Sequence, residues 1–380
     1  MKVIITPDSF KGSLTAVEVA DAVEKGIKSV FKDAETIKIP LADGGEGTVN
    51  CLVNATGGKI LHQEVMNPLG KEILASYGIL GDQKTAVIEM AEASGLTLIP
   101  LEQRNPLITT TYGTGQLIKA ALDQGCKKMI IGIGGSATND GGAGMVQALG
   151  IRLLDLEGKE IGYGGAELCK IDSIITSGMD SRVSSLKILV ASDVKNPLCG
   201  PSGATRIYGP QKGANEKMMQ ILEKGLAHFA ALINQTLNKD VKDIPGAGAA
   251  GGLGAGLMAF LDARLKSGIE VVIETVNLEE ALKDADLVIT GEGKIDYQTI
   301  YGKVPIGVAK VAKKYQVPVL AIGAIIEKDA EIVYQYGIDY LIKVSDPPMK
   351  LTESKENKIY LIKNCIKQFL KKQWDNHPED

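Results

Sequence analysis

Glycines gather in seven short windows of this chain, and several of the windows follow short runs of branched apolar residues. Of the 44 glycines among 380 residues, 25 lie in windows that together span only 55 residues. Glycine serves positions where the backbone takes a positive φ or approaches another group closely. The pattern favours a fold whose buried strands end in tight loops that a ligand can approach. The windows are 43–47, 113–115, 132–144, 200–213, 246–256, 291–293 and 302–307.

Composition and charge exclude several classes of protein. Hydrophobic residues make up 44% of the chain and the net charge is −4, so we expect neither disorder nor binding to nucleic acid. Five scattered cysteines without a CxxC pair indicate neither a zinc site nor a disulfide framework. No apolar run is long enough for a signal peptide or a membrane span. We therefore expect a cytoplasmic protein without a membrane partner.

Strands alternate with helices at both ends of the chain. The segment 3–5 is typical of a short buried strand, and it precedes a helix expected over about 16–31 and a second strand at 37–39. The alternation returns from about residue 284. Such spacing suits a parallel, doubly wound sheet.

The middle of the chain has a different pattern. Segments 58–66, 72–80 and 85–90 are typical of three strands of an antiparallel meander. We predict an α/β protein of two α/β domains. One is a Rossmann- or flavodoxin-like parallel-sheet domain built from both chain ends, and the other is an inserted domain with a mixed sheet. The predicted boundaries are 1–65 plus 275–380 for the first domain and 66–274 for the second.

Polar side chains follow the first two predicted strands directly. Asp8, Ser9 and Lys11 come after the first strand, and Asp43 ends the second before the turn 44–48. Open α/β sheets bind ligands at the carboxyl ends of their strands. Lys11 suits a phosphate, Ser9 a hydrogen bond, and Asp8 a cation or a proton. A capped strand-to-helix turn explains each segment about as well, and their occurrence together favours the functional interpretation.

The segment 132–142 follows a predicted strand at 128–131 and is rich in polar groups. It contains a GxGxxA match, and Asp155 follows about 20 residues later, so a nicotinamide-dependent oxidoreductase is a rival interpretation. Four polar residues in the same turn are more typical of phosphate and metal ligation. They are Ser136, Thr138, Asn139 and Asp140.

Three further segments complete the set of candidates. Asp193 ends a strand at 187–191 and precedes Arg206 and Lys212, which suit a carboxylate or phosphate. The segment 246–256 has no side chain able to do chemistry, and either a ligand or closely packed helices explain it. After a strand at 287–289, we expect a polar loop in which Lys294 suits a phosphate and Asp296 suits a proton or a metal.

Several catalytic motifs are absent from the sequence. It contains neither a P-loop motif nor the motifs of protein kinases. None of its three histidines lies in a glycine window. Carboxylates must therefore carry any proton transfer.

Eight segments together resemble the bacterial glycerate kinase family of the type that phosphorylates D-glycerate. They run in the order of that family and cover essentially the whole chain. The segments are PDSFKGS (7–13), LADGGEGT (41–48), YGTGQLI (112–118), GIGGSATNDGGAG (132–144), SDVKNPLCGPSGA (192–204), GPQKGA (209–214), PGAGAAGGLGAG (245–256) and GEGKIDYQTIYGK (291–303).

The resemblance implies transfer of a phosphoryl group from ATP, with Mg²⁺, to (R)-glycerate. It also implies two α/β domains with a cleft between them, one of them flavodoxin-like, and 2-phosphoglycerate as the main product. The alternatives are the same kinase giving 3-phosphoglycerate, the oxidoreductase, and a sensor that binds a sugar acid without catalysis. The sequence leaves a homodimer open.

We expect the residues singled out above to divide the work of this reaction. Asp193 is our hypothesis for the base, because it ends a strand beside the basic segment 206–212, and Arg206 is our choice for the glycerate carboxylate. The full catalytic set is Asp193, Asp8, Lys11 and Asp296, and the Mg²⁺ ligands are Asp43 and Asp193. The substrate set is Ser9, Asp43, Arg206, Lys212 and Lys294. The nucleotide set is Gly134, Gly135, Ser136, Thr138, Asn139, Asp140, Gly291 and Gly293.

Overall fold

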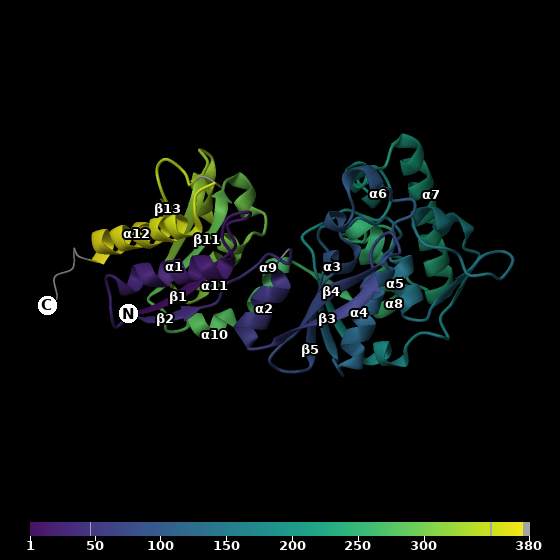
Figure 1. Cartoon of the computed structure of the whole chain (residues 1–380), viewed down its shortest axis with the longest axis horizontal. Helices are drawn as coiled ribbons and strands as arrows, with labels where there is room; N and C mark the ends of the chain where they lie inside the picture. Colours follow the sequence, from purple (N-terminus) through teal and green to yellow (C-terminus); the bar gives the residue numbers. More distant parts are fainter. Residues whose placement is uncertain (46, 350–351, 375–380) are drawn as a thin grey trace. The chain divides into compact units, whose positions relative to one another are not determined.

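The computed structural model describes residues 1–45, 47–349 and 352–374, and the chain forms two compact units (Figure 1). The first unit contains Met1–Asp43 together with the chain from Ile269 onward, and the second contains Gly44–Gly268. Within the described residues, no helix is both long and apolar enough to cross a membrane.

The first unit is built on a five-stranded parallel sheet. Its strands stand in the order β13-β12-β11-β1-β2. Counted along the chain within this unit and read from β2 to β13, the order is 2-1-3-4-5. This is the flavodoxin-like order, and its direction reverses between β1 and β11. The predicted fold class is confirmed here. The bounds are β1 (Lys2–Pro7), β2 (Glu35–Lys38), β11 (Leu287–Ile295), β12 (Val319–Ile326) and β13 (Tyr340–Lys343).

Helices cover this sheet with apolar stripes. In α1 (Ala16–Lys28), the N-cap Thr15 and Glu18 form a capping box, and the buried face carries Val19, Val23 and Ile27. A fully buried aliphatic side chain of this size stabilises the fold by about 1.5–3 kcal/mol. The other helices of the unit are α9 (Gly268–Thr275), α10 (Leu278–Leu282), α11 (Val304–Lys314) and α12 (Lys355–Trp374), with short 3₁₀ helices η7 (Tyr297–Ile300) and η8 (Ala330–Tyr336).

The second unit is built on a mixed six-stranded sheet in the order β10-β9-β6-β5-β4-β3. In this sheet, β3, β4 and β5 form the predicted antiparallel meander, and β5, β6, β9 and β10 run parallel to one another. A separate antiparallel ribbon joins β7 (Arg152–Leu154) and β8 (Ser173–Ile175). The sheet strands are β3 (Lys59–Met66), β4 (Glu72–Ile79), β5 (Thr85–Glu89), β6 (Lys128–Gly132), β9 (Lys187–Ala191) and β10 (Arg264–Lys266).

The helices of the second unit include one long element and several short ones. The longest is α7 (Glu216–Leu237), whose N-cap Asn215 accepts a hydrogen bond from the Met218 N–H. The others are α2 (Thr48–Thr56), α3 (Ala91–Ser94), α4 (Tyr112–Asp123), α5 (Ala143–Ala148), α6 (Ala204–Tyr208) and α8 (Leu253–Leu261), with 3₁₀ helices that include η5 (Pro210–Lys212) and η6 (Ala249–Gly252).

The boundaries of the two units differ from the predicted domain boundaries. The unit boundaries follow residues 43 and 268, whereas the predicted ones follow residues 65 and 274. Residues 44–65 belong to the second unit because β3 pairs with β4 along its whole length. The helix α2 also packs tightly on this sheet, since a Cβ at Gly78 of β4 would lie 2.5 Å from Cγ2 of Val53. Pairing partners, which a linear pattern does not reveal, decide this assignment.

The strand β11 continues well beyond the predicted segment 287–289. Its parallel pairing with β12 runs through Glu292 opposite Gly323 and Lys294 opposite Ile325. Gly291, Glu292, Gly293 and Lys294 are therefore strand residues, and the expectation of a loop there is wrong. The apolar segment 321–326 is the partner strand that holds them in place.

Candidate active site

The carboxyl end of β1 lies beside Gly291 of β11, at the point where the strand order of the first unit reverses. Asp8 follows β1 directly, and its backbone N–H donates to the carbonyl of Gly291 over 2.8 Å. The N–H of Ser9 donates to Asp8 Oδ1 over 2.6 Å. Gly293 also lies against this loop, since a Cβ there would be 3.3 Å from Cα of Phe10. Open α/β sheets bind their ligands at such a switch point.

The surroundings of Asp8 make it a weak acid. Burial raises the pKa of Asp8 to about 7, and the negative charges of Asp43 and Glu292 also raise it. The hydrogen bond from Ser9 and the charge of Lys11 lower it in part. A carboxyl group with a pKa near neutral pH exchanges protons readily under physiological conditions.

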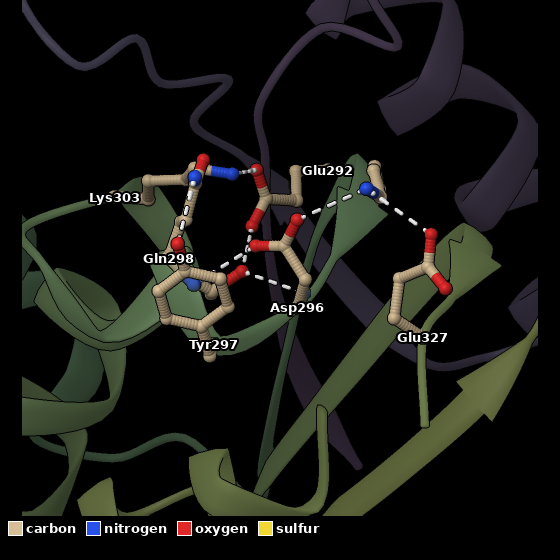
Figure 2. A network of polar contacts seen from close by, with 8 residues as sticks. Glu292, Asp296, Tyr297, Gln298, Lys303 and Glu327 are labelled. Carbon is tan, nitrogen blue, oxygen red and sulfur yellow. Dashed lines mark hydrogen bonds and ion pairs between the residues drawn. The ribbon is translucent and has the colours of Figure 1, made fainter. Parts of the chain in front are cut away.

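Glu292 links three parts of the first unit through its buried carboxylate. Its Oε1 accepts a hydrogen bond from the Thr299 hydroxyl over 2.6 Å, and its Oε2 accepts one from Lys303 Nζ over 2.8 Å (Figure 2). Burial raises the pKa of Glu292, whereas these two donors lower it. Both oxygens of Glu292 are thereby held in place by hydrogen bonds.

Asp296 holds the turn that follows β11. Its carboxylate accepts the N–H of Gln298 over 2.9 Å, and its own N–H donates to the Thr299 hydroxyl over 3.2 Å. Lys294 forms ion pairs with Asp296 at 3.3 Å and with Glu327 at 3.1 Å (Figure 2). The Lys294 side chain is half exposed; its partner Asp296 is buried, whereas Glu327 is exposed.

In the second unit, the segment 132–142 follows β6 and is anchored by Asp140. This carboxylate is fully buried and accepts hydrogen bonds from the N–H and hydroxyl of Thr111, both at 2.8 Å. It also accepts the N–H groups of Gly142 and Gly144, both at 3.2 Å. Burial raises the pKa of Asp140, and the four donors lower it. Asp140 therefore fastens the loop from inside.

Lys212 lies on the buried side of the same segment. Its Nζ donates to the Ser136 hydroxyl over 2.7 Å and to the carbonyl of Thr138 over 2.6 Å, and its side chain is 1% exposed. Burial lowers the pKa of Lys212 to about 7, and the charge of Asp140 offsets part of that effect. The ammonium group is occupied by protein oxygens, so it braces the loop from within the unit.

The outer part of this segment is accessible. Gly134 and Gly135 are exposed, and their N–H groups donate to no acceptor within the described part of the chain. Thr138 and Asn139 are buried, and Thr138 Oγ1 and Asn139 Oδ1 have no partner among the described residues. Adjacent free N–H groups in a glycine-containing bend form a concavity suited to an anion.

The glycine segment 246–256 packs against this loop. The N–H of Gly141 donates to the carbonyl of Gly251 over 3.1 Å. A Cβ at Gly251 would lie 2.0 Å from the carbonyl oxygen of Thr138, and one at Gly252 would lie 2.9 Å from Cα of Gly141. Of the two explanations for this segment, close backbone packing is the one that the contacts support.

Other predicted residues lie at the surface of the second unit. Asp193 is exposed two residues beyond β9. Arg206 forms an ion pair with Glu216 at 2.7 Å, and both side chains are exposed. Glu89 is a site residue that the sequence did not reveal: its buried carboxylate accepts the N–H of Val49 over 2.8 Å and that of Gly47 over 3.3 Å. A carboxylate that ends an otherwise apolar buried strand was the available signal.

The rival oxidoreductase interpretation does not fit the geometry. A dinucleotide fingerprint requires a helix that opens within the glycine turn, whereas α5 begins only at Ala143. The acidic residue should follow a neighbouring strand, whereas β7 pairs with β8 outside the six-stranded sheet. Asp155 instead caps a surface turn by accepting the N–H groups of Glu157 and Lys159, both at 2.9 Å.

Comparison with known proteins agrees with these observations. The sequence profile of the glycerate kinase family matches residues 3–373. The chain is 57% identical over 357 residues to a glycerate kinase of Bacillus subtilis, covering 94% of each chain. It is 58% identical over 344 residues to a glycerate 2-kinase of Escherichia coli, covering 90% of each. A crystal structure from Salmonella typhimurium LT2, of a protein provisionally called glycerate kinase 2, superposes with a TM-score of 0.93 at 50% identity over 99% of each chain. The chain is therefore a kinase that belongs to the glycerate kinase family.

Proposed function

We propose that this kinase transfers the γ-phosphoryl group of ATP to the 2-hydroxyl of (R)-glycerate, giving 2-phosphoglycerate and ADP. The names of the relatives support glycerate as the acceptor, and one of them is a glycerate 2-kinase. The observation that carries the proposal is Asp8, which lies at the switch point of the first sheet with Ser9 bonded to its carboxylate. Phosphoryl transfer needs little covalent help, and a positioned proton acceptor beside phosphate-binding groups suits it.

Asp8 is the base that we propose for this reaction. The hydroxyl oxygen of glycerate forms a bond to the γ-phosphorus while the bond from that phosphorus to ADP breaks. The hydroxyl proton passes to the Asp8 carboxylate, whose raised pKa favours accepting it. Asp193, the base expected from the sequence, remains the second candidate because it too follows a strand end.

The anionic groups of the reactants require donors and positive charge. We propose that the exposed N–H groups of Gly134 and Gly135 bind a phosphate of the nucleotide, while buried Lys212 and Asp140 hold the loop in shape. Lys11 and Lys294 remain proposals for the substrates, and Arg206 remains our proposal for the glycerate carboxylate. An Arg206 that binds glycerate must exchange its surface pairing with Glu216 for the ligand.

Mg²⁺ fits this scheme through few protein ligands. No group of three histidines, cysteines or acidic residues is arranged to hold a metal in the described parts of the chain. Mg²⁺ bound to a nucleotide takes most of its ligands from phosphates and water, with one or two carboxylates from the protein. The charge of Asp43 raises the pKa of Asp8, so a cation beside Asp43 would relieve that repulsion. Asp43 is a carboxylate that we propose for it, and Asp193 is the other candidate; bound Mg²⁺ would neutralise phosphate charge.

The test is a coupled assay of ADP release over a panel of hydroxy acids. We expect turnover with (R)-glycerate to exceed that with (S)-glycerate, lactate and glycolate, and ³¹P–¹H NMR of the product to place phosphorus on carbon 2. Phosphorus on carbon 3 would support the alternative product. ADP release that is independent of every hydroxy acid would refute the proposed function.

A further inference from the structure

Two lysines carry positive charge near the carboxyl end of β11, and their surroundings differ. Lys294 is 50% exposed and pairs with Asp296 and Glu327. Lys303 is 30% exposed and pairs with Glu292, a carboxylate that is only 9% exposed (Figure 2). Of these two lysines, the sequence indicates only Lys294 as a candidate for binding phosphate. Lys303 is the less exposed of the two, and it has one carboxylate partner among the described residues where Lys294 has two.

The pairing of Lys303 leaves part of its ammonium group available. An ammonium group has three N–H donors, and one of them serves Glu292 Oε2 at 2.8 Å. Glu292 is its one partner among the residues that the structure describes. The other oxygen of Glu292 is held by Thr299 at 2.6 Å, so the carboxylate is fixed on both sides. Two donors therefore remain on a partly exposed cation whose position is set by a rigid, buried acceptor.

The backbone around Lys303 also favours a negative charge. Lys303 is the N-cap of α11, an eleven-residue helix, and Gly302 before it has a φ of +96° that a residue with a side chain rarely adopts. The N-terminus of a helix carries a partial positive charge. Lys303, the helix terminus and the end of β11 thus meet within one short segment of the first unit.

We propose that Lys303 binds an anionic group of a reactant, with Glu292 as the residue that positions it. The inference rests on the proposed function, because the anion is a phosphate of the nucleotide or the carboxylate of the hydroxy acid. A Lys–Glu pair that orients the lysine toward phosphates is a general device in phosphoryl transfer, found in protein kinases on an unrelated fold. The competing explanation is that the network only fastens the turn 296–303 to β11.

The variant Lys303→Met removes the charge and keeps the length of the side chain. We expect kcat/KM to fall about 100-fold, the usual effect of losing one charged donor to a reacting or bound anion. A rise in KM for ATP identifies a phosphate as the anion, and a rise in KM for glycerate identifies the carboxylate. A fall in kcat alone identifies the phosphoryl group in transfer. Lys303→Arg, which keeps the charge, should recover at least about a tenth of the wild-type value.

Lys314→Met is the matched control. Lys314 pairs with Glu279 at 2.6 Å near the other end of the same helix, and both side chains are exposed. Breaking this surface pair should change kcat/KM by no more than about twofold, because exposed ion pairs contribute little. Glu292→Gln tests the positioning role, since it keeps the shape of the side chain and leaves Lys303 in place. We expect an intermediate loss of about tenfold.

Calorimetric titration of each variant with ATP and with glycerate separates this inference from the proposed function. If the wild-type protein turns over no hydroxy acid, that result counts against the proposed function alone. Weaker binding of ATP or glycerate by Lys303→Met would then still support an anion site at Lys303. Normal turnover and normal binding by a folded Lys303→Met would overturn the inference. If Lys303→Met does not fold, Lys303→Arg and Glu292→Gln decide by the same measurements.

Discussion

Lys212 Nζ donates to the hydroxyl of Ser136 over 2.7 Å, although 76 residues separate the two in sequence. The contact joins η5 to the loop after β6 inside the second unit. Lys212, which the sequence suggests as a ligand for a carboxylate or phosphate, instead holds this loop in place from inside the unit. The loop that exposes Gly134 and Gly135 therefore depends on a charge that solvent does not reach.

Replacing Lys212 with methionine should change how stability depends on pH. Burial lowers the pKa of Lys212 to about 7 from the ordinary 10.5, so the unfolded chain binds more protons than the native chain between these values. The free energy of unfolding contributed by this group therefore rises with pH across that window. Lys212→Met should lack that part of the slope in urea unfolding measured from pH 7 to 9.5. It should also raise KM for ATP, because Ser136 and Thr138 lose a donor.

The exposed Lys224 of α7 supplies the comparison for this experiment. Lys224→Met removes a lysine from the surface of the same unit and should keep the wild-type slope. A Lys212→Met slope identical to that of Lys224→Met would show that Lys212 is not buried as a low-pKa group.

Gly251→Ala should lower the free energy of unfolding far more than Gly57→Ala. The two glycines have almost the same φ, +66° and +65°, so the backbone strain of a side chain is equal, at about 1–2 kcal/mol. A Cβ at Gly57 meets nothing within 4 Å, whereas one at Gly251 collides with the carbonyl of Thr138. We expect the free energy of unfolding of Gly251→Ala to fall by about a further 2 kcal/mol or more, as in an overpacked core. KM for ATP should also rise. Equal unfolding free energies in the two variants would contradict the packing described for the segment 246–256.

The rate of phosphoryl transfer should follow the ionisation of Asp8. Its carboxylate must be charged to accept a proton, so kcat/KM should fall about tenfold per pH unit below the pKa of about 7. Asp8→Asn should remove this dependence and lower kcat by about 10²–10⁴-fold. The same measurement on Asp193→Asn decides between the two candidate bases. Loss of the acid limb in Asp193→Asn, with its persistence in Asp8→Asn, would transfer the role to Asp193.

Asp8 should also weaken the fold at alkaline pH. Its pKa is raised from 3.8 to about 7, so the native chain binds its proton more tightly than the unfolded chain. The stability from this group is fully present below about pH 4 and is lost as pH rises through 7. The free energy of unfolding of Asp8→Asn at pH 8, measured in urea, should therefore exceed that of wild type by about 1–4 kcal/mol. At pH 5 the difference should be smaller. An equal difference at both pH values would argue against the raised pKa.

Local patterns predict much of this fold. The apolar runs at 3–5 and 128–131 and the three meander strands were assigned by composition and alternation, and each forms a strand. The helix expected over about 16–31 forms as α1, which the capping box of Thr15 and Glu18 begins. These features are decided by residues close in sequence, which is why the sequence reveals them.

Features that depend on distant partners escaped prediction. The segment Gly291–Lys294 has low strand propensity by itself, and its pairing with β12 makes it a strand. Lys212, Asp140 and Glu89 were hard to place because charged residues are usually exposed, and each is buried here by donors or acceptors from elsewhere in the chain. The sequence located the loops that carry the candidate chemistry, and it did not reveal which polar groups face inward.

The separation of β1 from β11 imposes an order of events on biosynthesis. These neighbours pair through residues such as Thr6 and Thr290, which are 284 positions apart in the chain. At about 5–20 residues per second, a translating ribosome needs roughly 15–60 s to supply the second strand after the first. The intervening second unit has its own sheet and core, so it has time to fold while β1 waits with one side unpaired. The environment of Asp8, which requires Gly291 and Glu292, is consequently among the last parts of the enzyme to assemble, and a chain cut short before β11 lacks it entirely.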